Sequence, residues 1–177
     1  MNNTIGSRLY LIASYLLIVF AAFFTLMLLF VLPFAFAEPA LLFGFFILTG
    51  VVLYSFSSFQ FIKKGLEKGQ ILKARHKDFI KVNGYVVFFF VIQSFVGITD
   101  LLMKQAMLDQ VVETILSQNK ESFSALSPMQ IKELKVQLIS SLHVVMWVFL
   151  GYAVILAMHV IYTFRLLKKN NHLFAGA

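Results

Sequence analysis

Uncharged stretches divide the chain into four long apolar blocks. Residues 9–37, 39–62, 82–99 and 136–164 contain no Lys, Arg, Asp or Glu and are 29, 24, 18 and 29 residues long. A helix crosses the hydrocarbon core with about 20 apolar residues, because its backbone hydrogen bonds are satisfied internally. Apolar residues resume after Asp100, so the third helix is expected to continue. The pattern predicts an all-α integral membrane protein with four transmembrane helices, at about 9–32, 40–62, 82–103 and 128–167.

The charged residues between the blocks predict an orientation. If both termini and the inner basic loop at 63–81 lie on one side, that side holds 11 of the 15 Lys and Arg residues. The same side holds only two of the eight Asp and Glu residues. Short loops rich in Lys and Arg remain cytoplasmic. We therefore expect a multi-pass protein of a bacterial inner (plasma) membrane with its N- and C-termini in the cytoplasm.

Composition supports the membrane assignment and excludes several classes of function. With 60% hydrophobic and 13% charged residues, the chain has too little polar surface for a soluble globule of 177 residues. The net charge of +7 follows from the predicted cytoplasmic excess of Lys and Arg, so no nucleic-acid partner is expected. Cysteine is absent, which excludes disulfides and thiolate chemistry.

The segment between the first two blocks has two interpretations. Ala35, Phe36 and Ala37 resemble the small-x-small signal of a secretory cleavage site, whereas Pro33 and Pro39 around an acid indicate a turn. The apolar run before it is longer than the roughly 7 to 15 residues of a secretory signal. We therefore interpret residues 33–39 as a retained outer turn, with cleavage after Ala37 as the alternative.

Weak internal similarity suggests two tandem hairpins. Residues 7–20 align with 77–90 at an offset of 70, and residues 54–64 align with 159–169 at an offset of 105. The difference of 35 residues is an insertion before the fourth helix. The predicted fold is therefore two hairpins with an extracytoplasmic helical insertion between helices 3 and 4.

The insertion itself has helical periodicity. Apolar residues recur every three or four positions over 104–119, which predicts an outer amphipathic helix. Ser127, Pro128 and Gln130 then form a helix start signal, with a capping Ser, a Gln three residues later and Pro at the first helical position. A fourth helix of about 40 residues would extend about 60 Å, so its outer third is expected to project from the bilayer.

Polar side chains inside the blocks suggest one ligand pocket. Three tyrosines and one histidine lie four to nine residues inside the nearest Lys or Arg of the predicted cytoplasmic side, and the hairpin alignment sets Tyr15 opposite Tyr85 and Tyr54 opposite His159. Polar groups in lipid usually face the bundle interior. The predicted pocket comprises Tyr15, Tyr54, Tyr85 and His159 with Ser58 and Tyr152. The alternative is an interfacial aromatic belt, with His159 making a packing hydrogen bond.

Two further groups of residues were candidates for binding or gating. Near the outer side, Asp100 and His143 are a possible protonatable gate pair, and an i, i+4 ion pair of Asp100 with Lys104 is the simpler alternative. Near the inner side, a set of cations is expected to contact anionic lipid headgroups or a protein partner: Lys63, Lys64, Lys73, Arg75 and Lys77. Their alternative role is only to set the orientation.

Motifs for catalysis or cofactors are missing from the sequence. His143 and His159 are the only histidines in the predicted spans and share one helix, whereas a bis-histidine haem needs ligands on facing helices. No metal, phosphate-loop or nucleophile-elbow pattern occurs, so no cofactor is expected. The sequence favours a nonenzymatic accessory or scaffold subunit, with a protein partner or homo-oligomer. The alternatives are a small oligomeric transporter or channel and, third, an enzyme acting on lipid or quinone.

Overall fold

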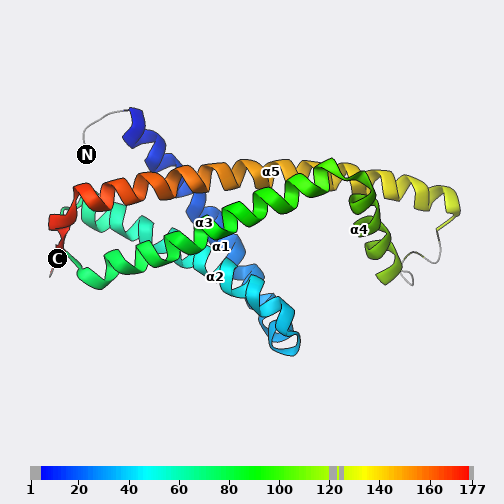
Figure 1. Ribbon diagram of the computed structural model, residues 1–177, viewed down its shortest axis with the longest axis horizontal. Coiled ribbons are helices and arrows are strands. Elements are labelled where there is room, and N and C mark those ends of the chain that lie inside the picture. The colour runs from blue at the N-terminus through cyan, green and yellow to red at the C-terminus, as the bar shows by residue number, and fades with distance from the viewer. Residues whose placement is uncertain (1–4, 120–122, 124–125, 176–177) are drawn as a thin grey trace. The chain divides into compact units, whose positions relative to one another are not determined.

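The apolar blocks form helices, because a backbone in lipid must bond its own N–H and C=O groups. The computed structural model describes residues 5–119, 123 and 126–175 (Figure 1). In chain order its elements are α1 (Ile5–Ala37), α2 (Pro39–Gln60), the π-helix η1 (Phe61–Glu67), β1 (Leu72–Lys73), α3 (Ala74–Met103), α4 (Gln105–Gln118), α5 (Pro128–Lys169), the 3-10 helix η2 (Asn171–Leu173) and β2 (Phe174–Ala175). Within this described chain, four helices are long and apolar enough to cross a membrane. The predicted all-α class with four membrane-spanning helices is confirmed at this level.

Two units make up the structure. The first contains Met1–Ile92 and Val154–Ala177, so it includes α1, α2, η1, the N-terminal part of α3 and the C-terminal part of α5. The second contains Gln93–Ala153 and includes α4.

In the first unit, α1 packs against α2 through one face (Figure 1). The buried side chains of α1 recur every three or four residues, which is the spacing of one helical face. They are Tyr10, Ser14, Leu17, Ala21, Phe24 and Leu28. Leu, Val and Phe side chains on its other faces are exposed, as expected for a helix surrounded by lipid.

The turn predicted at 33–39 is much shorter than expected. Helix α1 continues through Pro33 to Ala37, and Glu38 alone separates it from α2. Pro33 removes one backbone donor, but Glu38 N–H still bonds to Phe34 O at 3.0 Å. Pro39 occupies the first turn of α2, where its missing N–H has no partner to lose. Continuing the helix leaves fewer backbone groups unpaired, which explains why one proline did not end it.

The inner basic loop predicted at 63–81 is also mostly ordered into helix. Residues at its start belong to η1, and α3 begins at Ala74. Gly69 has φ of 62°, a left-handed conformation that glycine adopts readily, and it reverses the chain after η1. β1 then pairs in parallel with β2, with Leu72 opposite Phe174. The C-terminal end of the chain is thereby attached to this segment.

Glycines allow two close helix contacts in the first unit. A Cβ atom added to Gly50 of α2 would lie 2.5 Å from Val86 Cγ1 of α3. A Cβ atom added to Gly84 of α3 would lie 2.6 Å from two ring atoms of Phe164 on α5. Small residues at such crossings allow transmembrane helices to approach closely.

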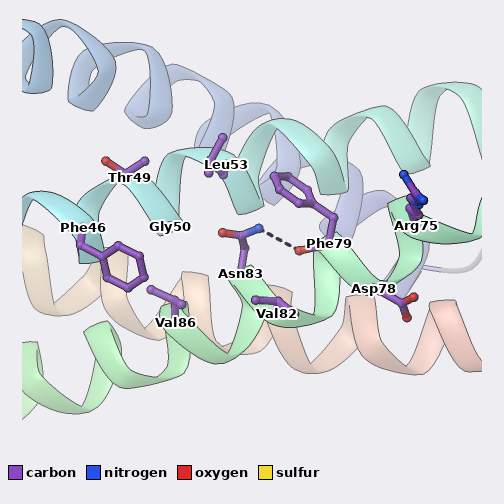
Figure 2. Close-up of a pocket in the computed structure, with 10 residues that line it drawn as sticks. All are labelled: Phe46, Thr49, Gly50, Leu53, Arg75, Asp78, Phe79, Val82, Asn83 and Val86. Carbon is purple, nitrogen blue, oxygen red and sulfur yellow. Dashed lines mark hydrogen bonds between the residues drawn. The ribbon is translucent and has the colours of Figure 1, made fainter.

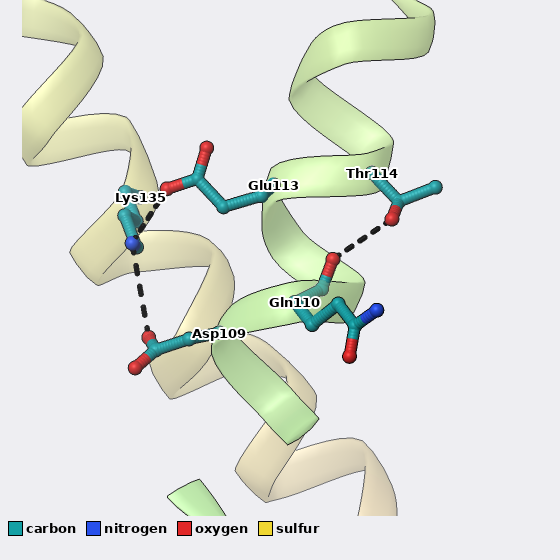
Figure 3. Close-up of polar contacts among 5 residues, drawn as sticks. All are labelled: Asp109, Gln110, Glu113, Thr114 and Lys135. Carbon is teal, nitrogen blue, oxygen red and sulfur yellow. Dashed lines mark hydrogen bonds and ion pairs between the residues drawn. The ribbon is translucent and has the colours of Figure 1, made fainter. Parts of the chain in front are cut away.

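In the second unit, α4 packs on the N-terminal half of α5. Leu108 and Val112 of α4 are buried, and Lys135 of α5 reaches back to two acids of α4 (Figure 3). Its Nζ lies 2.7 Å from Glu113 Oε1 and 3.8 Å from Asp109 Oδ1. The amphipathic helix therefore uses part of its apolar face within the chain itself.

The start signal of α5 forms the expected contacts. Ser127 N–H donates to Gln130 Oε1 at 2.8 Å, and Gln130 N–H lies 3.4 Å from Ser127 Oγ. Pro128 is the first residue of α5, which runs for 42 residues to Lys169. This reciprocal capping satisfies backbone donors that the first turn of a helix leaves free.

Candidate functional site

Five polar side chains from three helices form a buried cluster in the first unit. α1 contributes Tyr10 and Ser14, α2 contributes Tyr54, and α5 contributes His159 and Thr163. Each is at most 4% exposed. Tyr10 and Ser14 are four residues apart, as are His159 and Thr163, so each pair lies on one helical face. We call these residues the His159 cluster.

His159 is hydrogen-bonded through both ring nitrogens. Its Nε2 lies 2.8 Å from Ser14 Oγ, and its Nδ1 lies 2.9 Å from the Tyr54 hydroxyl. The ring also stacks on Tyr10, with centroids 4.6 Å apart. One side chain of α5 therefore bonds to α1 and α2 at the same time.

Thr163 closes the cluster from the next turn of α5. Its Oγ1 lies 2.9 Å from both the Tyr10 and the Tyr54 hydroxyls. Its own hydroxyl donates to the carbonyl of His159 at 2.8 Å, so both tyrosines must donate to it. The hydrogen bonds thus form a closed set among the three helices.

Counting protons suggests how His159 is held. The Ser14 hydroxyl donates to the carbonyl of Tyr10 at 2.7 Å, so Ser14 Oγ accepts from Nε2–H of His159. A neutral ring has a single N–H, so Nδ1 must accept from Tyr54. The Tyr54 proton is then shared between His159 and Thr163. The cluster contains no Asp or Glu, and a buried unpaired charge is costly, which favours the neutral ring.

Two residues predicted for the pocket lie outside this cluster. Tyr15 is 47% exposed, with its ring edge-on to Phe59 and Lys63 Nζ 5.0 Å from its centroid. Tyr85 is 64% exposed and contacts Phe164. Tyr15 and Tyr85 are therefore not members of the cluster that joins Tyr54 to His159. Consecutive residues of a helix are turned by about 100°, so the inward position belongs to Ser14 rather than to Tyr15.

Ser58 and Tyr152 are buried but are not members of the cluster, although the Ser58 side chain also interacts with Tyr54 one turn before it on α2. Ser58 Oγ donates to the carbonyl of Ser55 at 3.1 Å, within its own helix. Tyr152 is 3% exposed and belongs to the second unit. Tyr54 and His159 are thus the predicted pocket residues that the structure brings together. Sequence reasoning missed Tyr10 and Ser14, for which the available signal was their i, i+4 spacing beside the first apolar block.

A cavity of about 320 Å³ adjoins the His159 cluster between α1 and α5. It is lined mainly by apolar side chains, with Tyr10, His159 and Tyr162 as the exceptions. The hydroxyl of Tyr10 and both ring nitrogens of His159 are already bonded inside the cluster. The cavity therefore suits an apolar or weakly polar molecule better than an ion.

A second cavity, of about 440 Å³, lies between α2 and α3 (Figure 2). Figure 2 shows Arg75 and Asp78 at one end and Phe46 with Thr49 at the other. Asn83 donates to the carbonyl of Phe79 at 2.8 Å, one turn earlier on its own helix. This hydrogen bond uses one N–H of the Asn83 amide, and the neighbouring residues that line the middle of the cavity are mostly apolar.

The outer gate pair is not formed. Asp100 Oδ1 lies 3.2 Å from Lys104 Nζ, and both side chains are more than half exposed. His143 Nδ1 lies 2.9 Å from the carbonyl of Ile139 on its own helix. The simpler i, i+4 ion pair is therefore the observed one, because residues one turn apart are neighbours whatever the tertiary packing.

The predicted basic residues separate into different environments. Lys63 pairs with Glu67 at 3.0 Å, whereas Lys64 and Lys73 are exposed. Arg75 lines the cavity of Figure 2. Lys77 lines a third cavity together with Lys81 and Lys168. The sequence pattern did not predict a binding role for Lys81 or Lys168. The five residues therefore do not share one cavity.

No protein-family model, curated protein or solved structure matches this chain. The function must therefore be argued from its own side chains. Within the described residues, no group of three or more His, Asp or Glu side chains comes together in a way that could hold a metal ion. The His159 cluster connects helices, and the cavity beside it offers few free polar atoms.

Proposed function

We propose that this chain is a nonenzymatic accessory or scaffold subunit of a membrane complex. The closure of the His159 cluster is the observation that carries the proposal. Its polar atoms bond to one another across α1, α2 and α5, so they hold the helices rather than line an open route. Because these buried polar groups hold helices together and are not free to bind a substrate, we expect the chain to act by contacting partners through its surface.

The proposed setting is a bacterial inner membrane. Both termini and the segment around η1 lie in the cytoplasm, as the distribution of Lys and Arg supports. Helices α1 and α2 form one hairpin, α3 and α5 form the second, and α4 belongs to an extracytoplasmic insertion. The length of α5 supports this arrangement, because 42 residues extend about 63 Å, roughly twice the hydrocarbon thickness.

Labelling of single cysteines is expected to support this topology. The natural chain has no cysteine, so each variant carries one reporter. Ser117→Cys at the end of α4 should react with a membrane-impermeant maleimide in intact cells, whereas Lys64→Cys in η1 should react only after lysis. Both positions are exposed, so burial does not explain a difference between them. Reaction of Lys64→Cys in intact cells would contradict the orientation.

The proposed partner surface lies on α4. Met107 and Val111, one turn apart, are 41% and 39% exposed, although Leu108 and Val112 beside them are buried. An exposed apolar stripe next to a docked one is suited to a second helix or to a protein partner. The inner surface carries the exposed cations Lys64 and Lys73, which are suited to anionic lipid or an acidic partner.

Gentle solubilisation of native membranes is expected to recover this chain with a partner in fixed stoichiometry. A Met107→Ser, Val111→Ser variant should lose that partner, whereas Gln110→Ala, on the exposed side of the same helix, should retain it. Native mass spectrometry measures both outcomes. A chain recovered only as monomer would contradict the proposal.

A small transporter or channel is the second candidate. The cavity of about 320 Å³ beside Tyr10 and His159 favours it, since an amphipathic molecule fits such a site. One bundle of four helices leaves little room for a pathway, so this function requires a homo-oligomer. Recovery of a pure homo-oligomer in the same experiment would favour this alternative over the scaffold.

A further inference from the structure

Three lysines from two helices line one cleft in the first unit. Lys77 and Lys81 are one turn apart near the start of α3, and Lys168 lies at the end of α5. The cleft has a volume of about 450 Å³ and is completed by Tyr85, Phe164 and Asn171. We call it the lysine cleft.

Among the residues that the structure describes, no carboxylate oxygen lies within 4.0 Å of an ammonium nitrogen of this cleft, although Asp78 lies between Lys77 and Lys81 on the same helix. The ion pairs found within 4.0 Å involve Lys63, Lys104 and Lys135, and none involves a lysine of the cleft. Like charges one turn apart repel each other, so Lys77 and Lys81 are destabilising unless an anion joins them.

Lys77 is held in place by its other contacts. Its ammonium group donates to Asn171 Oδ1, and its Nζ lies 6.0 Å from the centre of the Phe174 ring. Asn171 belongs to η2 and Phe174 to β2, which pairs with β1. The C-terminal segment thus orients one cation of the cleft, and an ammonium group still has two further protons to donate.

The opposite end of the cleft is aromatic. Tyr85 lies eight residues after Lys77, about 12 Å further along α3. Its ring contacts Phe164 of α5, with centroids 5.4 Å apart. Lys81 immediately precedes the uncharged block at 82–99, so the cleft extends from the charged ends of two helices to the beginning of their apolar spans. A free phosphate would use only the first part of such a site.

We infer that the lysine cleft binds one anionic phospholipid. Lys77, Lys81 and Lys168 receive its phosphate, and its glycerol and the first part of an acyl chain lie along Tyr85 and Phe164. Lysine donors and an apolar wall at a membrane boundary suit this chemistry. The inference rests on the proposed membrane placement but not on the protein partner, because the site is complete within one chain.

Native mass spectrometry of the purified full-length chain tests the inference. Titration with phosphatidylglycerol should show one saturable lipid per chain, and phosphatidylcholine should bind at least about tenfold more weakly. Inorganic phosphate, added as a competitor, should not displace the lipid. Equal binding of the two lipids, or displacement by phosphate, would overturn the assignment.

Two matched triple variants distinguish lipid binding at the lysine cleft from general attraction of an anionic lipid to a positively charged protein. Lys77→Gln, Lys81→Gln, Lys168→Gln should weaken phosphatidylglycerol binding by about tenfold or more. Lys68→Gln, Arg165→Gln, Lys169→Gln removes the same charge from exposed positions outside the cleft and should have little effect. Equal losses in both variants would show diffuse attraction and overturn the site.

The single variant Lys168→Gln keeps the test valid if the triple variant folds poorly. Lys168 is exposed, so its replacement should not disturb the helices. Phosphatidylglycerol binding should be about fivefold weaker in Lys168→Gln. The variant Lys168→Arg keeps the charge and should bind the lipid as the natural chain does. Unchanged binding in Lys168→Gln would contradict its place in the site. Because only lipid is measured on the isolated chain, this result is independent of any partner.

Discussion

Replacing Gly50 by alanine is expected to destabilise the protein by about 1–3 kcal/mol, which is typical of overpacking at a tight contact. The new methyl group would lie 2.5 Å from Val86 Cγ1 and 3.1 Å from Val86 Cβ. Val86 is branched at Cβ and has few allowed rotamers, so its side chain cannot rotate away from the new methyl group. Helices α2 and α3 must therefore separate. Unfolding in mixed micelles, followed by circular dichroism, measures the change.

Gly44 provides the matched control on the same helix. A Cβ atom there would have no heavy atom within 4 Å, so Gly44→Ala should be neutral or slightly stabilising. Adding Val86→Ala to Gly50→Ala removes the Cγ1 atom that makes the 2.5 Å contact but keeps Cβ at 3.1 Å, so it should recover part of the lost stability. If Gly44→Ala and Gly50→Ala behave alike, α2 and α3 are not in close contact at Gly50.

Replacing His159 by phenylalanine is expected to cost about 2 kcal/mol or more of unfolding free energy. The change removes hydrogen bonds to Ser14 and Tyr54, each contributing on average about 0.6 kcal/mol in a membrane protein. It also leaves the buried Ser14 oxygen without its donor, at about 1–3 kcal/mol for an unsatisfied group. Ser14 still donates to the Tyr10 carbonyl, and Tyr54 still donates to Thr163. The same unfolding measurement applies.

His143 is the control for this change. It lies on the same helix, but among the described residues its ring bonds only to the carbonyl of Ile139, so His143→Phe should have a much smaller effect. A double-mutant cycle with Tyr54→Phe should give a coupling of about 0.5–3 kcal/mol, as expected for residues in direct contact. Equal effects of His159→Phe and His143→Phe would mean that the His159 cluster does not join the helices.

The two predictions also address function. Under the scaffold proposal, His159→Phe acts through stability, and partner recovery should fall only as far as the folded fraction falls. Under the transporter alternative, His159 faces the ligand cavity, so transport should fall even where folding is preserved. Measuring stability and partner recovery on the same preparation therefore distinguishes the two functions.

Features that depend on neighbouring residues could be predicted from the sequence. The four spans follow from hydrophobic length, because lipid allows few other structures for an apolar chain. The contacts of Ser127 with Gln130 and of Asp100 with Lys104 follow from helical spacing alone. These interactions form within one turn of a helix, so they do not require knowledge of the packing.

The candidate sites depended on contacts between distant segments. Tyr54 and His159 are 105 residues apart, and the hairpin alignment set them opposite each other, as the structure does. The same alignment selected Tyr15, whereas in the structure the neighbouring residue Ser14 bonds to His159. Lys81 and Lys168 are brought to one cleft only by the packing of α3 on α5. A helix turns by about 100° per residue, so an error of one position moves a side chain from the interior to the lipid. Length and hydrophobicity therefore determined which segments are helices, whereas only the tertiary structure decided which of their faces meet.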